Sequence, residues 1–172
     1  DRLWEKFRSR VSYVNNYEKL VQDSGASFFN DHIALRTFCS QNPLAGISST
    51  SRIFEALGYR GEDCYNFEDK HLSAIYFQHP QPSFPKVFIS ELRTWELKPS
   101  SKHIIHGALK THRTNLPESF LADLHHLETK SESSRASLLE EAVEFFHELP
   151  WHLPEKSDLL ELNLDSQYAA WV

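Results

Sequence analysis

Apolar and polar residues along the first hundred positions switch between a helical and a strand-like period. Residues 3–21 space their apolar side chains by three and four, which predicts an amphipathic helix that ends near Gly25. Residues 30–38 alternate instead and are rich in strand formers, and residues 49–57 return to helical spacing before Gly58. Three further strands are predicted at residues 59–67, 72–78 and 86–93. This order of elements is a βαβββ module.

The last third of the chain has a different character, with helical spacing and few β-branched residues. Helices are predicted at residues 102–112, 117–129, 134–149 and 157–171. We therefore predict an α+β fold: a βαβββ module with a mixed sheet, an N-terminal helix and a helical C-terminal region. The expected domains are residues 1–100, with the N-terminal helix and the βαβββ module, and residues 101–172, a helical region.

Composition narrows the class of protein. The 172 residues carry a formal charge of −6, which argues against a nucleic-acid binder because such proteins present a basic surface. No run approaches the length of a membrane span, and no export signal is visible at the start. Cys39 and Cys64 are too few for a disulfide framework and suit a reducing compartment. We expect a soluble intracellular protein of the cytoplasm or an organelle (plastid or mitochondrion), without a signal for its oligomeric state.

The strand at residues 30–38 carries the sharpest candidate chemistry. Alternation places His32 and Arg36 on one face, with Ala34 and Phe38, and turns the face that begins at Ile33 towards the core. Their Cα atoms would lie about 13 Å apart along the strand. A neutral imidazole is a good ligand for a first-row metal, and a guanidinium pairs bidentately with a carboxylate. We expect both to face one cavity in which a metal and an anionic substrate meet. A hydrogen-bonded histidine and an ion-paired arginine are the structural alternative.

Other titratable residues give weaker signals. Glu91 lies in an apolar strand, where an edge position or a salt bridge is favoured over a metal-ligand role. His103 and His106 lie three apart on one helical face but lack the H-E-x-x-H pattern of a zinc site. Glycine-rich phosphate loops and the G-x-S-x-G nucleophile elbow are absent from the sequence, so ATP, dinucleotide and serine-hydrolase chemistry have no support.

The run at residues 30–38 also resembles a known family. This run, Asn-Asp-His-Ile-Ala-Leu-Arg-Thr-Phe, is similar to the H-x-x-x-R segment of the 2-oxoadipate dioxygenase/decarboxylase family, which has a vicinal-oxygen-chelate, glyoxalase-like fold. Further similar stretches follow in order at residues 57–59, 70–78, 85–92 and 166–172. The resemblance thus touches most of the chain.

The resemblance implies a specific reaction. Members bind one non-haem Fe(II) through two histidines and one glutamate, and convert 2-oxoadipate and O₂ to 2-hydroxyglutarate and CO₂ in lysine catabolism. The motif assigns His32 as a metal ligand that also contacts substrate, and Arg36 as the residue that binds and orients a substrate carboxylate. The expected partners are a small 2-oxo dicarboxylic acid and O₂, with no nucleic acid and no membrane.

The resemblance also leaves alternatives. In the family the second histidine and the glutamate come from a later module, so we expect this chain to be incomplete and to supply one ligand of three. A glyoxalase-like isomerase or hydrolase with another divalent metal would still use His32. A binding module that has kept the sheet and lost the metal would need neither His32 nor Arg36.

Overall fold

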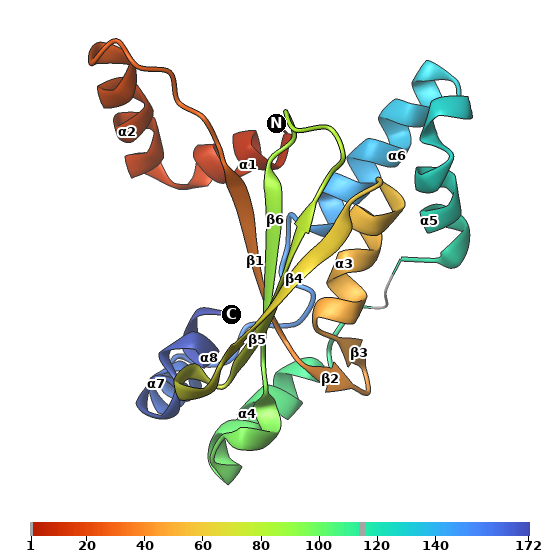
Figure 1. Ribbon diagram of the computed structural model, residues 1–172. Coiled ribbons are helices and arrows are strands. Elements are labelled where there is room, and N and C mark those ends of the chain that lie inside the picture. Colours follow the sequence, from red (N-terminus) through yellow and green to blue (C-terminus); the bar gives the residue numbers. More distant parts are fainter. Residues whose placement is uncertain (1, 114–115) are drawn as a thin grey trace.

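The computed structural model describes residues 2–113 and 116–172 and contains a four-stranded mixed sheet (Figure 1). The strand order is β1–β6–β5–β4, with β1 parallel to β6 and the other pairs antiparallel. The strands are β1 (His32–Phe38), β4 (Arg60–Phe67), β5 (Leu72–Gln78) and β6 (Lys86–Leu92). With α3 (Ile47–Ala56) between β1 and β4, the predicted βαβββ order is confirmed. A small hairpin that was not predicted, β2 (Ser40–Gln41) and β3 (Leu44–Ala45), connects β1 to α3.

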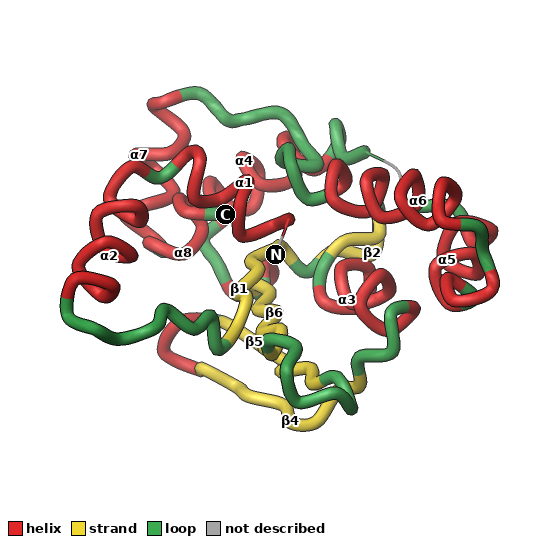
Figure 2. Tube along the Cα trace, turned by 90° about the horizontal axis from the view of Figure 1, so that it is seen from above, coloured by secondary structure: helices red, strands yellow, loops and turns green. Residues whose placement is uncertain are grey.

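Helix α3 covers one face of the sheet. Its buried side chains Ile47 and Phe54 pack against Phe77, Val87 and Ile89 of the strands. Because strand side chains alternate, this face is the one that Ile33 and Leu35 of β1 share, as the sequence pattern predicted. Two further helices, α5 (Glu118–His125) and α6 (Glu132–Phe145), pack on α3 through a separate apolar cluster. These helices form an outer layer on this side of the molecule (Figure 2).

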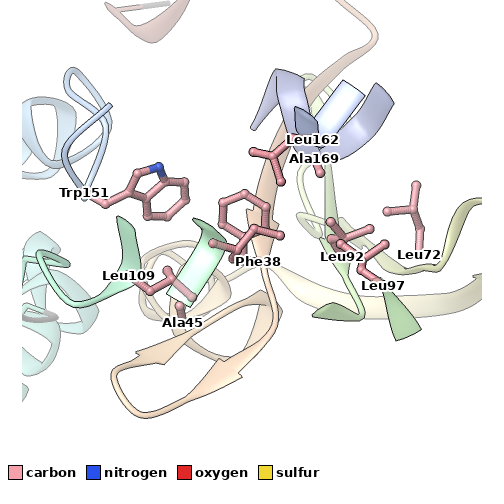
Figure 3. Close-up of a cluster of buried hydrophobic side chains, with 10 residues drawn as sticks. Phe38, Ala45, Leu72, Leu92, Leu97, Leu109, Trp151, Leu162 and Ala169 are labelled. Atoms are coloured by element: carbon pink, nitrogen blue, oxygen red, sulfur yellow. The ribbon is translucent and has the colours of Figure 1, made fainter. Parts of the chain in front are cut away.

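The opposite face of the sheet is covered only at one end. There Phe38, Leu72 and Leu92 are buried against α4 (Pro99–Leu109), α7 (Lys156–Asp165) and α8 (Gln167–Trp171) (Figure 3). The helices contribute Ile105, Leu109, Leu162 and Ala169, together with Trp151 from the preceding loop. Towards the start of β1 the same face is exposed at His32, Ala34 and Arg36. The helices therefore cover the sheet at the end of β1 and leave His32 and Arg36 accessible at its start.

The C-terminal helices share this core with the strands. The proposed division near residue 100 stays a prediction. Residues 1, 114 and 115, which fall within the two predicted domains, lie outside the described residues. No helix in the described ranges combines the length and apolar character required to cross a bilayer.

The N-terminal segment differs from its prediction. Instead of one helix it forms α1 (Arg2–Arg10) and α2 (Ser12–Asp23), because Val11 is extended, with φ −111° and ψ 91°. Periodicity could not reveal this break, since both halves keep helical spacing. Arg2 and Lys6 of α1 pair with acidic residues on α6, whereas α2 extends away from the sheet (Figure 1). The predicted end of the segment is confirmed by the left-handed φ of 78° at Gly25.

Candidate functional site

Strand β1 presents its polar side chains on the exposed face of the sheet. His32, Ala34 and Arg36 are exposed, whereas Ile33 and Leu35 are half-buried on the α3 side. The predicted alternation is therefore confirmed over this part of the strand. Phe38, assigned to the same face as His32, is buried because α8 and Trp151 close over that end.

His32 and Arg36 line two adjacent hollows rather than the single cavity that was expected. A hollow of about 380 Å³ lies among α1, the free edge of β1 and the end of α6, and contains His32. A second hollow, of about 620 Å³, lies over the sheet beside α8 and contains Arg36. The one residue common to both is Ala34. His32 and Arg36 are four residues apart on β1. This separation places His32 beside α1 and Arg36 beside α8.

The His32 imidazole has one ring nitrogen engaged and the other open. Its Nδ1 lies 3.4 Å from the Asp31 carboxylate, and no contact to Nε2 is found among the described residues. A carboxylate at one ring nitrogen orients the ring and leaves the other nitrogen for a metal, a common arrangement for histidine ligands. No group of three or more His, Cys, Asp or Glu residues that could hold a metal ion exists within residues 2–113 and 116–172. His32 thus fits the role of one ligand in a set.

The Arg36 guanidinium packs on aromatic rings instead of pairing with an acid. It lies 5.5 Å from the centre of the Tyr168 ring and 5.3 Å from that of the Trp171 ring. No ion pair to Arg36 is found in the described part of the chain, so the alternative of an ion-paired arginine is not met. Stacking on two rings holds the group in place without neutralising its charge. The guanidinium is therefore available to an external carboxylate.

Tyr168 is fixed by hydrogen bonds to the strand next to Arg36. Its hydroxyl donates to the Ser90 carbonyl at 2.8 Å and shares a second hydrogen bond of 2.8 Å with the Ser90 hydroxyl. Ser90 is the residue of β6 directly opposite Arg36 in the sheet register. Burial raises the pKa of Tyr168, so its hydroxyl stays protonated. Sequence reasoning noted this C-terminal segment but assigned no role to Tyr168, because a contact across 78 positions leaves no local pattern.

Glu91 lies on the face of the sheet opposite to His32 and has a structural function. Its carboxylate accepts a hydrogen bond of 2.8 Å from the backbone N–H of Ile47, the first residue of α3. The expected edge position or salt bridge is wrong, because β6 is an interior strand and the partner is a helix N-terminus. Burial, and then the nearby Glu91 carboxylate, raises the pKa of the Cys39 thiol to about 11.

The two histidines three residues apart that the sequence analysis considered, His103 and His106, are exposed on α4.

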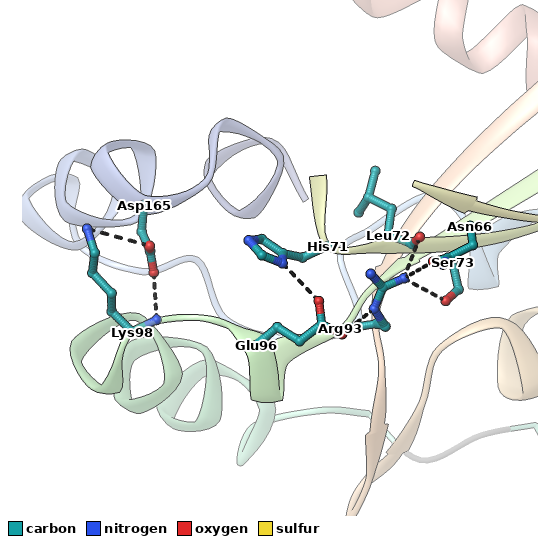
Figure 4. Close-up of polar contacts among 8 residues, drawn as sticks. All are labelled: Asn66, His71, Leu72, Ser73, Arg93, Glu96, Lys98 and Asp165. Atoms are coloured by element: carbon teal, nitrogen blue, oxygen red, sulfur yellow. Dashed lines mark hydrogen bonds and ion pairs between the residues drawn. The ribbon is translucent and has the colours of Figure 1, made fainter. Parts of the chain in front are cut away.

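A polar cluster that sequence reasoning missed lies where β5 begins and β6 ends (Figure 4). The Nδ1 of His71 lies 2.8 Å from one oxygen of Glu96, and the other oxygen accepts a 2.6 Å hydrogen bond from Arg93. These two donors, Arg93 first, lower the pKa of Glu96. Arg93 is anchored in turn by the carbonyl of Leu72 at 2.7 Å and by Ser73 at 3.2 Å. His71 and Arg36 thus line the same hollow.

Comparison with known proteins adds independent evidence. The family described as 2-oxoadipate dioxygenase/decarboxylase matches residues 5–172. The chain is 31% identical over 151 residues to the chloroplastic/amyloplastic 2-oxoadipate dioxygenase/decarboxylase of Oryza sativa, covering 82% of this chain and 35% of the relative. An Arabidopsis thaliana chloroplastic enzyme of the same description is 27% identical, again with 82% and 35% covered. The chain therefore spans about a third of the length of these curated relatives.

Solved structures agree on the fold. A glyoxalase-superfamily protein from Ralstonia eutropha superposes with a TM-score of 0.87 at 21% identity, covering 98% of this chain and 55% of that one. The Oryza sativa hydroxyglutarate synthase, solved in complex with 2-oxoadipate, gives a TM-score of 0.72 at 27% identity, with 99% and 51% covered. The predicted glyoxalase-like α+β fold is thereby confirmed. The family match covers residues 5–172, and the similar structures have the same fold. The chain therefore belongs to the 2-oxoadipate dioxygenase/decarboxylase family.

Proposed function

We propose that this chain provides the substrate-binding face of an Fe(II)-dependent dioxygenase that converts 2-oxoadipate and O₂ to 2-hydroxyglutarate and CO₂. The observation that carries the proposal is the pair of available groups on β1: the open Nε2 of His32 and the Arg36 guanidinium without an acidic partner among the described residues. Family membership supplies the reaction class, and the relatives' names supply the substrate.

In this proposal His32 is one of the iron ligands and Asp31 orients its ring. When bound, ferrous iron would supply the activation of O₂ next to a chelating 2-oxo acid. A second histidine and a glutamate would complete the set from residues other than those described, since no suitable cluster is present among them. The Asp31 contact favours the ring tautomer with its proton on Nδ1, which keeps Nε2 as the donor atom.

Arg36 would hold a carboxylate of the substrate. Its planar fork offers parallel N–H donors, and each charge-assisted hydrogen bond contributes about 1.5–3 kcal/mol where water is excluded. Tyr168 and Trp171 limit the motion of the guanidinium, so less conformational freedom is lost when the acid binds. The chain thereby orients the acid along β1, with one end beside His32 and the other beside Arg36.

The proposal is tested by the stoichiometry of the reaction. Full-length protein reconstituted with Fe(II) is assayed in an oxygen electrode with 2-oxoadipate, while released CO₂ and 2-hydroxyglutarate are quantified. One O₂ consumed for each CO₂ and each 2-hydroxyglutarate formed supports the proposal. Isomerase or hydrolase turnover without O₂ uptake, supported by another divalent metal, would instead select a glyoxalase-like enzyme. Absence of any bound metal and any turnover would select a binding module.

A further inference from the structure

The side of the sheet that carries α3 contains a further hollow, away from His32 and Arg36. Its volume is about 790 Å³, and it lies between α3 and the strands β4 and β5. β4 is the outer strand of the sheet and is exposed along its whole length. The hollow is therefore open to small molecules from solvent.

The side chains around this hollow carry acids and no base. Glu55 of α3, Glu62 of β4 and Glu91 of β6 line it, whereas no lysine, arginine or histidine does so in the described part of the chain. Asp63 also lines it and accepts a 2.8 Å hydrogen bond from the backbone N–H of Cys64. Neither Glu55 nor Glu62 forms an ion pair with a described residue. This surplus of negative charge suits a cationic ligand.

A buried hydroxyl in the wall of the hollow has no partner. Ser51 lies four residues before Glu55, so the two side chains are on the same side of α3. Ser51 is only 4% exposed and lines the hollow, and no hydrogen bond to its hydroxyl is found among the described residues. Buried hydroxyls are normally hydrogen-bonded, because an unsatisfied one costs free energy. A ligand with an N–H donor at this point would satisfy the Ser51 oxygen.

Along α3 the acids lie at opposite ends of the hollow. Glu91 accepts a hydrogen bond from the N–H of Ile47, the first residue of the helix, whereas Glu55 is in the last turn. Eight residues of α-helix separate these two positions by about 12 Å, and Ser51 lies halfway between them. An ionised carboxylate can accept several hydrogen bonds, so Glu91 can bind a ligand as well as Ile47.

The strands give the same separation. In the sheet register Glu91 is opposite Ser73, which is opposite Asn66 of β4. Glu62 lies four residues before Asn66, about 13 Å along the strand. Ile75 of β5 lies between the two ends and lines the hollow. The hollow thus combines acids at both ends, a hydroxyl acceptor in the middle and an apolar surface between them.

We propose that this hollow binds a linear polyamine, an aliphatic cation with two terminal ammonium groups and an inner secondary ammonium. One terminal group lies beside Glu55 and Glu62, and the other lies beside Glu91. The inner ammonium donates a hydrogen bond to the Ser51 hydroxyl, and the methylene groups lie over Ile75. Binding at this site depends neither on iron nor on turnover at the opposite face of the sheet.

Two probes of equal length test the role of Ser51. Spermidine has an inner secondary ammonium, whereas 1,8-diaminooctane has a methylene group in its place. Both are titrated calorimetrically into the full-length protein at low ionic strength, where exposed charges are least screened. We expect spermidine to bind wild type more tightly than 1,8-diaminooctane does. Ser51→Ala should lower spermidine affinity about tenfold, the effect of losing one hydrogen bond to a charged group, and leave 1,8-diaminooctane affinity unchanged.

Charge variants test the ends of the site and stand in for Ser51→Ala if that variant does not fold. Glu55→Gln and Glu62→Gln are exposed changes and should each weaken both probes several-fold. Glu161→Gln, an exposed acid on α7, and Arg36→Lys should bind both probes as wild type does. No spermidine binding by wild type, equal affinity of the two probes, wild-type affinity in the site variants, or an equal loss in Glu161→Gln would overturn the proposal.

Discussion

At the scale of single residues, the site consists of side chains that are not neutralised by an opposite charge: Arg36 packs on aromatic rings, and the Nε2 of His32 has no partner among the described residues. Arg36 shows this most clearly, since it lies over the Tyr168 and Trp171 rings without an acidic partner among the described residues. Arg36 is exposed to solvent, so its charge is free to pair with an anion that enters the hollow beside α8. The arrangement therefore favours an anionic ligand at this point.

Arg36→Lys tests the need for a planar fork. An ammonium keeps the charge but cannot make two parallel hydrogen bonds or stack on both rings. We expect KM for 2-oxoadipate to rise by about tenfold or more, corresponding to about 1.4 kcal/mol or more of binding free energy. Arg60→Lys, at an exposed position of β4, is the control and should leave KM unchanged. Wild-type kinetics for Arg36→Lys would contradict the assignment.

Cys39 gives a prediction that depends on pH. Its thiol has a pKa of about 11 instead of the ordinary 9.0, so the folded protein keeps it protonated between these values. Because the thiolate is the nucleophile, alkylation by iodoacetamide at pH 8.5 should be about a hundredfold slower than for an unperturbed cysteine, and should accelerate as pH approaches 11. Peptide mass spectrometry resolves the sites, with exposed Cys64 as internal reference. Equal labelling of both cysteines at pH 8.5 would refute this.

At the scale of elements, the start of α3 is held by a strand residue rather than by a residue of its own segment. The helix predicted from residue 49 begins at Ile47, and its N-cap is Gly46, with φ 109° and no side-chain hydrogen bond. Glu91 of β6 takes that function by accepting from Ile47. A side chain at Gly46 would come within 2.4 Å of the Glu91 carboxylate, so the glycine permits this close approach.

Glu91→Gln distinguishes this structural function from a metal-ligand role. The amide keeps an acceptor but loses the charge at the helix N-terminus, which costs about 1 kcal/mol and lowers Tm by about 2–4 °C. Iron content should stay at the wild-type level, because Glu91 lies on the face opposite to His32. Glu62→Gln on exposed β4 is the control for charge alone. Loss of iron at an unchanged Tm would show that Glu91 is a ligand.

The docking of α8 on the sheet gives a second prediction at this scale. Tyr168→Phe keeps the ring beneath Arg36 but removes both hydrogen bonds to Ser90. We expect the free energy of unfolding to fall by about 1 kcal/mol and Tm by about 2–4 °C. Tyr13→Phe is the matched control, because Tyr13 is 70% exposed on α2. An unchanged melting curve for Tyr168→Phe would mean that these hydrogen bonds do not hold α8.

At the scale of the whole molecule, local sequence patterns predicted most helices and strands. The arrangement of the site depends on contacts between residues far apart in the sequence. The run from β4 to β6 was predicted to within a residue at each end because alternation and turn residues are local signals. The break at Val11 and the β2–β3 hairpin were missed, since neither interrupts the periodicity strongly. For the site, alternation predicted that His32 and Arg36 share a face, but not that Ala34 divides two hollows.

The missed members of the site have a common cause. Tyr168, Trp171 and Glu96 reach their partners through the packing of helices and turns onto the sheet, which depends on the whole fold. His71 belonged to a stretch that resembled the family, yet a histidine between a turn and a strand has no distinguishing pattern. Only its left-handed backbone and its contact with Glu96 identify it.

The central claim is that β1 presents a metal ligand and a carboxylate-binding arginine on one accessible face, and iron content tests it most directly. Full-length wild type, His32→Ala and the exposed control His103→Ala are loaded anaerobically with Fe(II), desalted and analysed for iron, with circular dichroism as the check on folding. The account predicts about one iron per chain in wild type and control, and loss of iron from folded His32→Ala. Wild-type iron content in His32→Ala would contradict it.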